Sequence, residues 1–229
     1  MTDLELMRAR LPVLYTLNDR ARLLRVNEPN GAAAPRFFMG RTARGLEWRF
    51  REDIDEVTVE AMSAVCRIEP VGATLSPLPS GTDRYREFLG GPAGQWAGPA
   101  YRFPALLPPV TDAVAITSDN AGLLEADFPD WLAEVPLRQP FMALLVERRV
   151  VSICCSVRIG ALVHEAGVET HPLWRGRGCA AQVTAAWAAI VWTTYGAHPV
   201  YSTTWENAAS QAVAKRLRLV QFGVDFDLE

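Results

Sequence analysis

Several signatures are absent from this chain of 229 residues, and each absence excludes a class of protein. The four cysteines form no C-x-x-C pair, so neither a zinc ribbon nor a redox dithiol is indicated and no metal is expected. A net charge of −3 gives no reason to expect nucleic acid as a partner. The N-terminus alternates charged and apolar residues without the apolar core of a signal peptide. We therefore expect a cytoplasmic protein with buried, free thiols.

One long segment has no formal charge. Neither Asp, Glu, Lys nor Arg occurs from Gly178 to Trp205, a length that a transmembrane span could have. Threonine, glutamine, glycine and histidine residues interrupt the segment, and Pro199 stands within it. We therefore predict a buried helix followed by a buried strand, and no membrane as a partner.

What is present is a hydrophobic fraction of 49%, enough for the core of one large or two small domains. Apolar residues at helical spacing predict a helix over residues 1–25, and alternation predicts a strand pair over 36–51. A helix is predicted over 55–66, capped by Asp53 or Asp55. Residues 67–112 are crowded with proline and glycine, with one short helix around 83–89. We interpret this stretch as an ordered loop over a substrate site, although a linker is the alternative.

The pattern becomes clearer after residue 110, and it alternates strands with helices. The predicted elements are a strand at 114–116, helical segments over 120–135, a hairpin of 141–147 with 150–158, a strand at 166–171, a helix at 178–195, a strand at 199–204, a helix at 208–217 and a strand at 220–228. The predicted class is therefore α/β, with a mixed sheet flanked by helices.

The segment Val168 to Ala180 is the most informative one. It predicts a strand, a turn bounded by proline, a glycine loop and the start of a long helix. The free N–H groups and the dipole of a helix N-terminus both favour negative charge, and Arg175 and Arg177 flank the loop. The loop lacks the Lys-Ser or Lys-Thr of a P-loop, and Ala181 stands where a dinucleotide fingerprint needs its third glycine. The spacing therefore suggests a cradle for a pyrophosphate.

This order of elements, with two short motifs, resembles the GNAT N-acetyltransferase superfamily. The superfamily's acyl-CoA loop has Gln or Arg, two residues, Gly, one residue, then Gly or Ala, which are Arg175, Gly178 and Ala180 here. Its second motif is Asn with Ala or Ser three residues on, which corresponds to Asn207 and Ser210. The stretch 201–210 is similar to a bacterial branch with an extra N-terminal region. The resemblance implies a GNAT-type domain over 110–229 and an acceptor-side subdomain of α/β type over 1–109.

The resemblance also implies acetyl-CoA as the acyl donor. The expected cofactor-binding residues are Val168, Thr170, Arg175, Gly176, Arg177, Gly178, Cys179, Ala180, Asn207 and Ser210. The strand at 168–170 would pair edge-on with the amide-bearing arm of CoA, unless it is an inner strand paired on both sides. Asn207 would either bind CoA or cap the helix that follows.

The implied chemistry is direct attack of an amine on a thioester, which needs a base because an amine of pKa ~10 is mostly protonated at neutral pH. Glu165 and Glu169 are the candidates. They lie roughly 13 Å apart on a strand, so only one can reach the thioester, and Glu165 is preferred because it is farther from the loop. His164 and His171 are further candidates for the base, although a structural role is favoured for each. The family's tyrosine acid is replaced by Ala214, which leaves Ser210, Tyr201 or water as candidates.

The sequence thus predicts an N-acetyltransferase that uses acetyl-CoA and acts on a small-molecule amine. A non-catalytic acyl-CoA-binding or sensing protein of the same fold is the alternative, and a structural partner protein is a second one. The acceptor, the length of the acyl group and the oligomeric state stay open.

Overall fold

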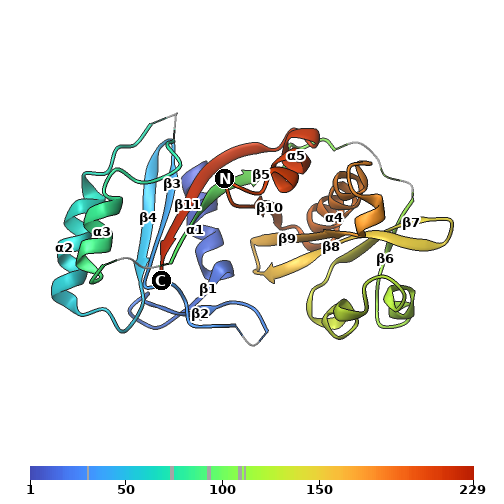
Figure 1. Ribbon diagram of the computed structural model, residues 1–229, viewed down its shortest axis with the longest axis horizontal. Coiled ribbons are helices and arrows are strands. Elements are labelled where there is room, and N and C mark those ends of the chain that lie inside the picture. Colours follow the sequence, from blue (N-terminus) through green and yellow to red (C-terminus); the bar gives the residue numbers. More distant parts are fainter. Residues whose placement is uncertain (30, 73–74, 92–93, 108–109, 111) are drawn as a thin grey trace. The chain divides into compact units, whose positions relative to one another are not determined.

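The computed structural model describes residues 1–29, 31–72, 75–91, 94–107, 110 and 112–229, and it divides into two compact units (Figure 1). Unit 1 comprises residues 1–101, 202–207 and 221–229. Unit 2 comprises residues 102–201 and 208–220. The predicted boundary between residues 109 and 110 falls beside positions 108, 109 and 111, which lie outside the described residues.

Unit 1 begins with helix α1 (Asp3–Leu14), which Thr2 and Glu5 open with a reciprocal capping box. The predicted helix over residues 1–25 is wrong beyond Leu14. Strands β1 (Tyr15–Leu17) and β2 (Leu23–Val26) form an antiparallel pair there. The side chain of Asn18 accepts hydrogen bonds from the N–H groups of Arg20 and Arg22 and so stabilises the turn between the two strands.

The sheet of unit 1 has the order β4-β3-β11-β5. Strands β3 (Phe37–Thr42) and β4 (Gly45–Phe50) form the predicted hairpin. Strand β11 (Val220–Leu228) returns from the far end of the sequence to pair antiparallel with β3. Strand β5 (Gln95–Arg102) lies beside β11, inside a stretch that the sequence marks as irregular.

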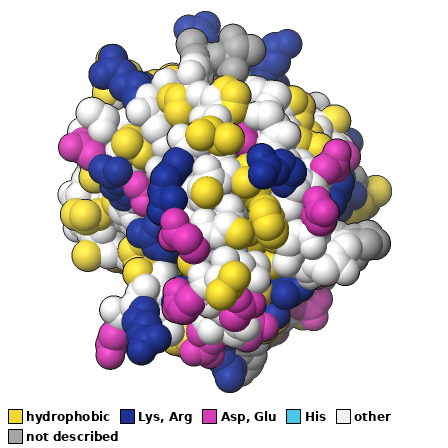
Figure 2. All heavy atoms as spheres, turned by 90° about the vertical axis from the view of Figure 1, so that its left-hand side faces the viewer, with side chains coloured by type: hydrophobic (Ala, Val, Ile, Leu, Met, Phe, Trp, Pro, Cys, Tyr) yellow, Lys and Arg dark blue, Asp and Glu magenta, His cyan; other side chains and the backbone are white. Residues whose placement is uncertain are grey.

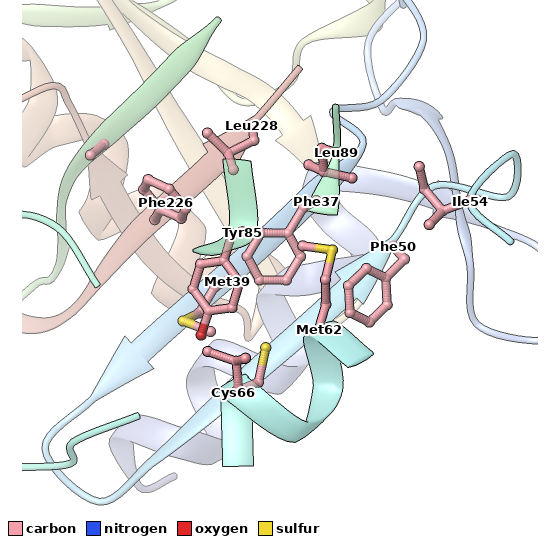
Figure 3. Close-up of a cluster of buried hydrophobic side chains, with 12 residues drawn as sticks. Phe37, Met39, Phe50, Ile54, Met62, Cys66, Tyr85, Leu89, Phe226 and Leu228 are labelled. Atoms are coloured by element: carbon pink, nitrogen blue, oxygen red, sulfur yellow. The ribbon is translucent and has the colours of Figure 1, made fainter. Parts of the chain in front are cut away.

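Helices α2 (Glu56–Arg67) and α3 (Thr82–Phe88) cover one face of this sheet. Both were predicted, and Asp55 caps α2 by accepting from the N–H of Thr58. Figure 3 shows the core between them, where aromatic side chains of β3, β4 and α3 meet the sulfur atoms of α2. Its labelled members are Phe37, Met39, Phe50, Ile54, Met62, Cys66, Tyr85, Leu89, Phe226 and Leu228.

The sheet of unit 2 has the order β10-β9-β8-β7-β6 and is mixed, as predicted. Strands β6 (Ala113–Ala115), β7 (Phe141–Val146), β8 (Arg149–Ile159) and β9 (Val163–Thr170) are antiparallel neighbours, whereas β10 (His198–Ser202) runs parallel to β9. The predicted hairpin and strand order are confirmed, and β9 begins three residues before its predicted start.

Different helices pack on the two faces of this sheet. Helix α4 (Cys179–Tyr195) packs on one face, where its Trp187 is fully buried. The short 3₁₀ helices η1 (Ala121–Leu124) and η2 (Pro129–Leu137) form a second apolar cluster with β7 and β8. Helix α5 (Ala208–Arg216) packs against α4. The chain therefore has a mixed α/β fold with helices flanking its sheet.

Candidate functional site

The glycine loop of unit 2 has the backbone that an anion site requires. A 3₁₀ turn, η3 (Pro172–Trp174), follows β9, and α4 begins after Gly178. Gly176 and Gly178 have φ angles of +74° and +84°, a region that other residues rarely adopt. No side chain in the described part of the chain caps α4, so the N–H groups of its first turn lack helical acceptors. These donors and the helix dipole favour an anion.

Three arginines surround this loop. Arg175 donates from Nε to the carbonyl of Thr170 at 3.2 Å, and the Arg177 guanidinium lies 4.9 Å from the centre of the Trp174 ring. The third is Arg216, which the sequence did not indicate. A Cβ at Gly178 would stand only 2.7 Å from its Cζ. Because α5 brings Arg216 to the loop from 38 positions away, no local spacing could have revealed it.

Strand β9 is open along part of one edge. Its other edge pairs with β8 from Ser152–Thr170 to Ile159–His164. On the side of β10 only three pairs form, and the last joins Val200 to Glu165. Beyond that pair, residues 166–170 of β9 have no strand on this side among the described strands. An extended ligand with amide groups could therefore add to this edge, which leads from the anion loop to Glu165.

The two candidate bases occupy different surroundings on β9. Glu165 is only 2% exposed and lies at the last β9–β10 pair, with Arg158 of β8 as its neighbour on the other side. Glu169 is exposed, and one of its carboxylate oxygens accepts a hydrogen bond of 2.7 Å from the indole N–H of Trp131 in η2. Glu165 thus stands where the strands separate, whereas Glu169 links β9 to η2.

His164 is held in a buried chain of hydrogen bonds. The Trp187 indole can only donate, and it donates to Ser156 Oγ at 3.1 Å. Ser156 Oγ also lies 2.9 Å from His164 Nδ1, and the tautomer of the imidazole ring decides which of these two groups donates. Burial also lowers the pKa of His164, so its ring is neutral at neutral pH.

His171 precedes the loop. Its Nδ1 accepts from the N–H of Leu173 at 3.4 Å, and its Nε2 faces Asp127 at 3.6 Å. Hydrogen bonds from Arg149 lower the pKa of Asp127. This histidine therefore joins η3 to the segment between η1 and η2.

The start of α5 holds a close pair of hydroxyl groups. Tyr201 Oη of β10 and Ser210 Oγ of α5 are 2.5 Å apart. Ala214 of α5 is buried. Asn207 stands immediately before α5, and its backbone N–H donates to the carbonyl of Thr204.

The four cysteines are free and buried, as predicted. Burial raises the pKa of Cys66 and of Cys155 to about 12 and that of Cys154 well above its ordinary value. These three thiols are therefore protonated at neutral pH and are poor nucleophiles. Within the described ranges no three His, Cys, Asp or Glu side chains gather as a metal ion would require, and no described helix could cross a membrane.

A separate open hollow of about 530 Å³ lies in unit 1. The Arg51–Asp53 ion pair lies in its wall, and Arg51 also donates to the carbonyl of Ala34. None of the predicted site residues lines it.

No protein-family model matches the sequence, and no curated protein matches it. Among solved structures, the chain is similar to a GNAT-family protein from Novosphingobium aromaticivorans, with 19% identity over 59% of this chain and a TM-score of 0.45; the match spans 64% of that protein. It is also similar to a GCN5-related N-acetyltransferase-like protein from Streptococcus suis, with 14% identity over 86% of this chain and 85% of that one and a TM-score of 0.48.

A third similar structure is a ribosomal L7/L12 α-N-protein acetyltransferase in complex with coenzyme A. Identity is 13%, coverage is 54% of this chain and 97% of that one, and the TM-score is 0.39. At these values the likeness transfers neither ligand nor residue roles. A functional assignment therefore depends on the residues of this chain.

Proposed function

We propose that this chain is a GNAT-type acyltransferase that moves an acetyl group from acetyl-CoA to the amine of a small molecule. The observation that carries the proposal is the loop at 175–178. It combines two left-handed glycines, an uncapped helix N-terminus and three arginines. Such a concentration of positive charge suits an anion of more than one charge, as a pyrophosphate provides.

The donor would follow the open edge of β9. The N–H groups of Cys179 and Ala180, with Arg175, Arg177 and Arg216, would hold the pyrophosphate. The amides of the CoA arm would pair with the strand at 168–170. Thr170 and Glu165 lie five residues apart, roughly 16 Å along a strand, so the arm would bring the thioester towards the last β9–β10 pair and Glu165. Asn207 and Ser210 stay in the proposal as further contacts to CoA.

Glu165 would then be the base. The amine nitrogen bonds to the acyl carbon, the C–S bond breaks with its electron pair going to sulfur, and the amine proton goes to Glu165 directly or through water. Glu169 is less suited because the indole of Trp131 engages one of its oxygens. The N-terminal region would shape the acceptor pocket. A net charge of −3 fits a cationic acceptor but is too small to select one.

Titration calorimetry with acetyl-CoA, CoA and ATP tests the proposal. We expect micromolar binding of both CoA species and none of ATP. Arg216→Ala should weaken CoA binding about tenfold by removing a charge-assisted hydrogen bond. Lys215→Ala, which removes the neighbouring exposed cation of α5, is the matched control and should leave affinity unchanged. Wild-type protein that binds neither CoA species would refute the proposal and favour a structural partner protein.

The absence of the family's tyrosine favours one rival, a protein that binds acyl-CoA without catalysis. The buried methyl group of Ala214 can donate no proton. An enzyme should consume acetyl-CoA with some amine in a broad panel, whereas a sensor should bind acetyl-CoA and leave it intact with every one.

A further inference from the structure

Strand β4 is the outer strand of the sheet in unit 1. All six of its residues pair with β3, and among the described strands none joins its opposite edge. The residue after it, Arg51, forms a bridge with Leu23 of β2, so the open edge is limited to residues 45–50. Proline, lysine or a bulge usually protects such an edge. This strand contains neither proline nor lysine, and its pairing with β3 is regular.

The hydrogen bonds show which backbone groups of β4 face outwards. The N–H of Arg51 donates to the carbonyl of Arg36, the residue before β3, at 2.9 Å. In an antiparallel ladder every second residue bonds to the neighbouring strand, and the residues between direct their N–H and C=O groups to the other side. The outward-facing residues of β4 are therefore Leu46, Trp48 and Phe50.

Arg49 lies over the centre of this open edge. Its Nη1 donates to the outward carbonyl of Trp48 at 2.7 Å and lies 3.3 Å from the carboxylate of Glu47. Its Nε is buried and has no hydrogen-bond partner among the described residues. A buried donor without an acceptor costs free energy, so this cover of the edge is imperfect. A further acceptor beside β4 would satisfy the guanidinium better.

We propose that two copies of this chain pair edge to edge through β4, antiparallel and about a twofold axis at Trp48. The strand is self-complementary in this register. Trp48 meets Trp48 of the second copy, Leu46 meets Phe50, and Glu47 meets Arg49. Apolar pairs and opposite charges directly across two strands are stabilising. The N–H of each Trp48 would replace Arg49 on the carbonyl of the other, and Arg49 would turn to Glu47 of the second copy.

The charges of β4 select this register and this partner. A slip of two residues one way would place Glu47 opposite Glu47 of the second copy, and a slip the other way would place Arg49 opposite Arg49. Like charges directly opposite each other are destabilising, so both slipped registers are disfavoured. The same patch serves both copies, so the interface is isologous and closes as a dimer.

Amide hydrogen exchange, resolved by residue with NMR and measured over a range of protein concentrations, tests the proposal on the full chain. The N–H groups of Glu47 and Arg49 bond to β3 and should exchange slowly at every concentration. Those of Leu46, Trp48 and Phe50 should exchange rapidly in dilute protein and about tenfold more slowly in concentrated protein. Sedimentation velocity should show a dimer over the same concentration range.

Leu46→Pro removes one outward N–H and leaves the ladder to β3 intact, so the protein should fold but no longer form the dimer. Ala115→Pro on β6, the outer strand of unit 2, is the matched control. Because the N–H of Ile116 donates to the carbonyl of Phe141 on β7, the N–H of Ala115 faces away from β7. This substitution should leave the dimer unchanged.

Two results would overturn the inference. One is rapid exchange at all three outward residues in concentrated wild-type protein. The other is a dimer of wild-type strength in Leu46→Pro. If Leu46→Pro does not fold, the alternating exchange pattern of the wild type still decides. Binding of CoA enters none of these measurements, so their outcome is independent of the proposed function.

Discussion

Glu165 and Glu169 have the same side chain, but their surroundings predict different consequences of mutation. Glu165→Gln is isosteric and cannot accept a proton, so we expect acetyl transfer to fall about 10²- to 10⁴-fold. Glu169→Gln keeps an oxygen for the Trp131 indole and should retain activity within a few-fold. Steady-state kinetics on an acceptor from the amine panel would measure both. Equal losses in the two variants would contradict the assignment of the base, and unchanged CoA affinity would confirm that both proteins fold.

Asp227 on β11 predicts a pH dependence of stability. Burial, and then the neighbouring charges of Asp225 and Glu229, raise its pKa to about 7. A raised carboxyl pKa means that the folded state binds this proton more tightly than the unfolded state, whose pKa is ~3.9. Its contribution to the free energy of unfolding is therefore present below about pH 4 and is lost as pH rises towards about 7.

Urea unfolding at pH 5 and pH 8 checks this expectation. Asp227→Asn should remove much of the loss of stability between the two pH values. Asp53→Asn is the control, because hydrogen bonds from Arg51 lower the pKa of Asp53 and its effect is confined to acid pH. An equal pH dependence in wild type and Asp227→Asn would show that Asp227 does not carry the effect.

At the scale of the element, α4 has a left-handed glycine at each end, and the two provide a matched pair. Gly178 and Gly196 have φ angles of +84° and +63°. Alanine at either position should lower the free energy of unfolding by about 1–2 kcal/mol, because a Cβ is strained there. Only at position 178 would the Cβ also displace the Arg216 guanidinium; nothing lies within 4 Å of the Cβ at 196.

Calorimetry combined with urea unfolding separates these two effects. Gly178→Ala should lose both stability and CoA affinity, whereas Gly196→Ala should lose stability alone. Wild-type CoA affinity in a folded Gly178→Ala protein would contradict the assignment of the loop.

The elements that could be predicted are those with a local signal. The loop from Arg175 to Gly178 and the helix after it are visible because glycine spacing and an apolar stripe occupy consecutive residues. Strand β5 was missed because Gly98 and Pro99 interrupt its pattern. A Cβ at Gly98 would stand 1.7 Å from the carbonyl oxygen of Thr203, so the glycine permits a close approach between distant segments. Similarly, only the packing of α5 brings Arg216 to the loop.

The same limit applies to the first 25 residues. The apolar spacing that predicts a helix is real as far as Leu14. After it, the choice between helix and strand depends on the pairing of β1 with β2 and on the turn at Asn18. Tertiary pairing overrode a weak local preference there.

At the scale of the whole molecule, the sequence and the structure divide the chain differently. Strand β11 belongs to unit 1 from Gln221 onward, although it follows every residue of unit 2. Its apolar side chains are buried in unit 1, at positions Phe222, Val224, Phe226 and Leu228. The described face in Figure 2 mixes acidic and basic side chains, in keeping with a small net charge.

This division predicts how a fragment would behave. A chain of residues 110–229 would expose the apolar side of β11, so we expect it to aggregate or to unfold without cooperativity. A fragment of residues 102–220 keeps only the first residue of β11 and should stay more soluble. Size-exclusion chromatography and thermal unfolding of both fragments would measure this, and a monomeric, cooperative 110–229 fragment would contradict it.

The path of the chain between the units also fixes an order of events during synthesis. The ribosome makes α1, the β3–β4 hairpin and α2 first, yet β11, the partner of β3, is translated after all of unit 2. For most of translation the edge of β3 that later pairs with β11 therefore has no partner strand. Unit 2 can fold in that interval. Unit 1 is therefore the first unit to be synthesised in part and the last to be completed.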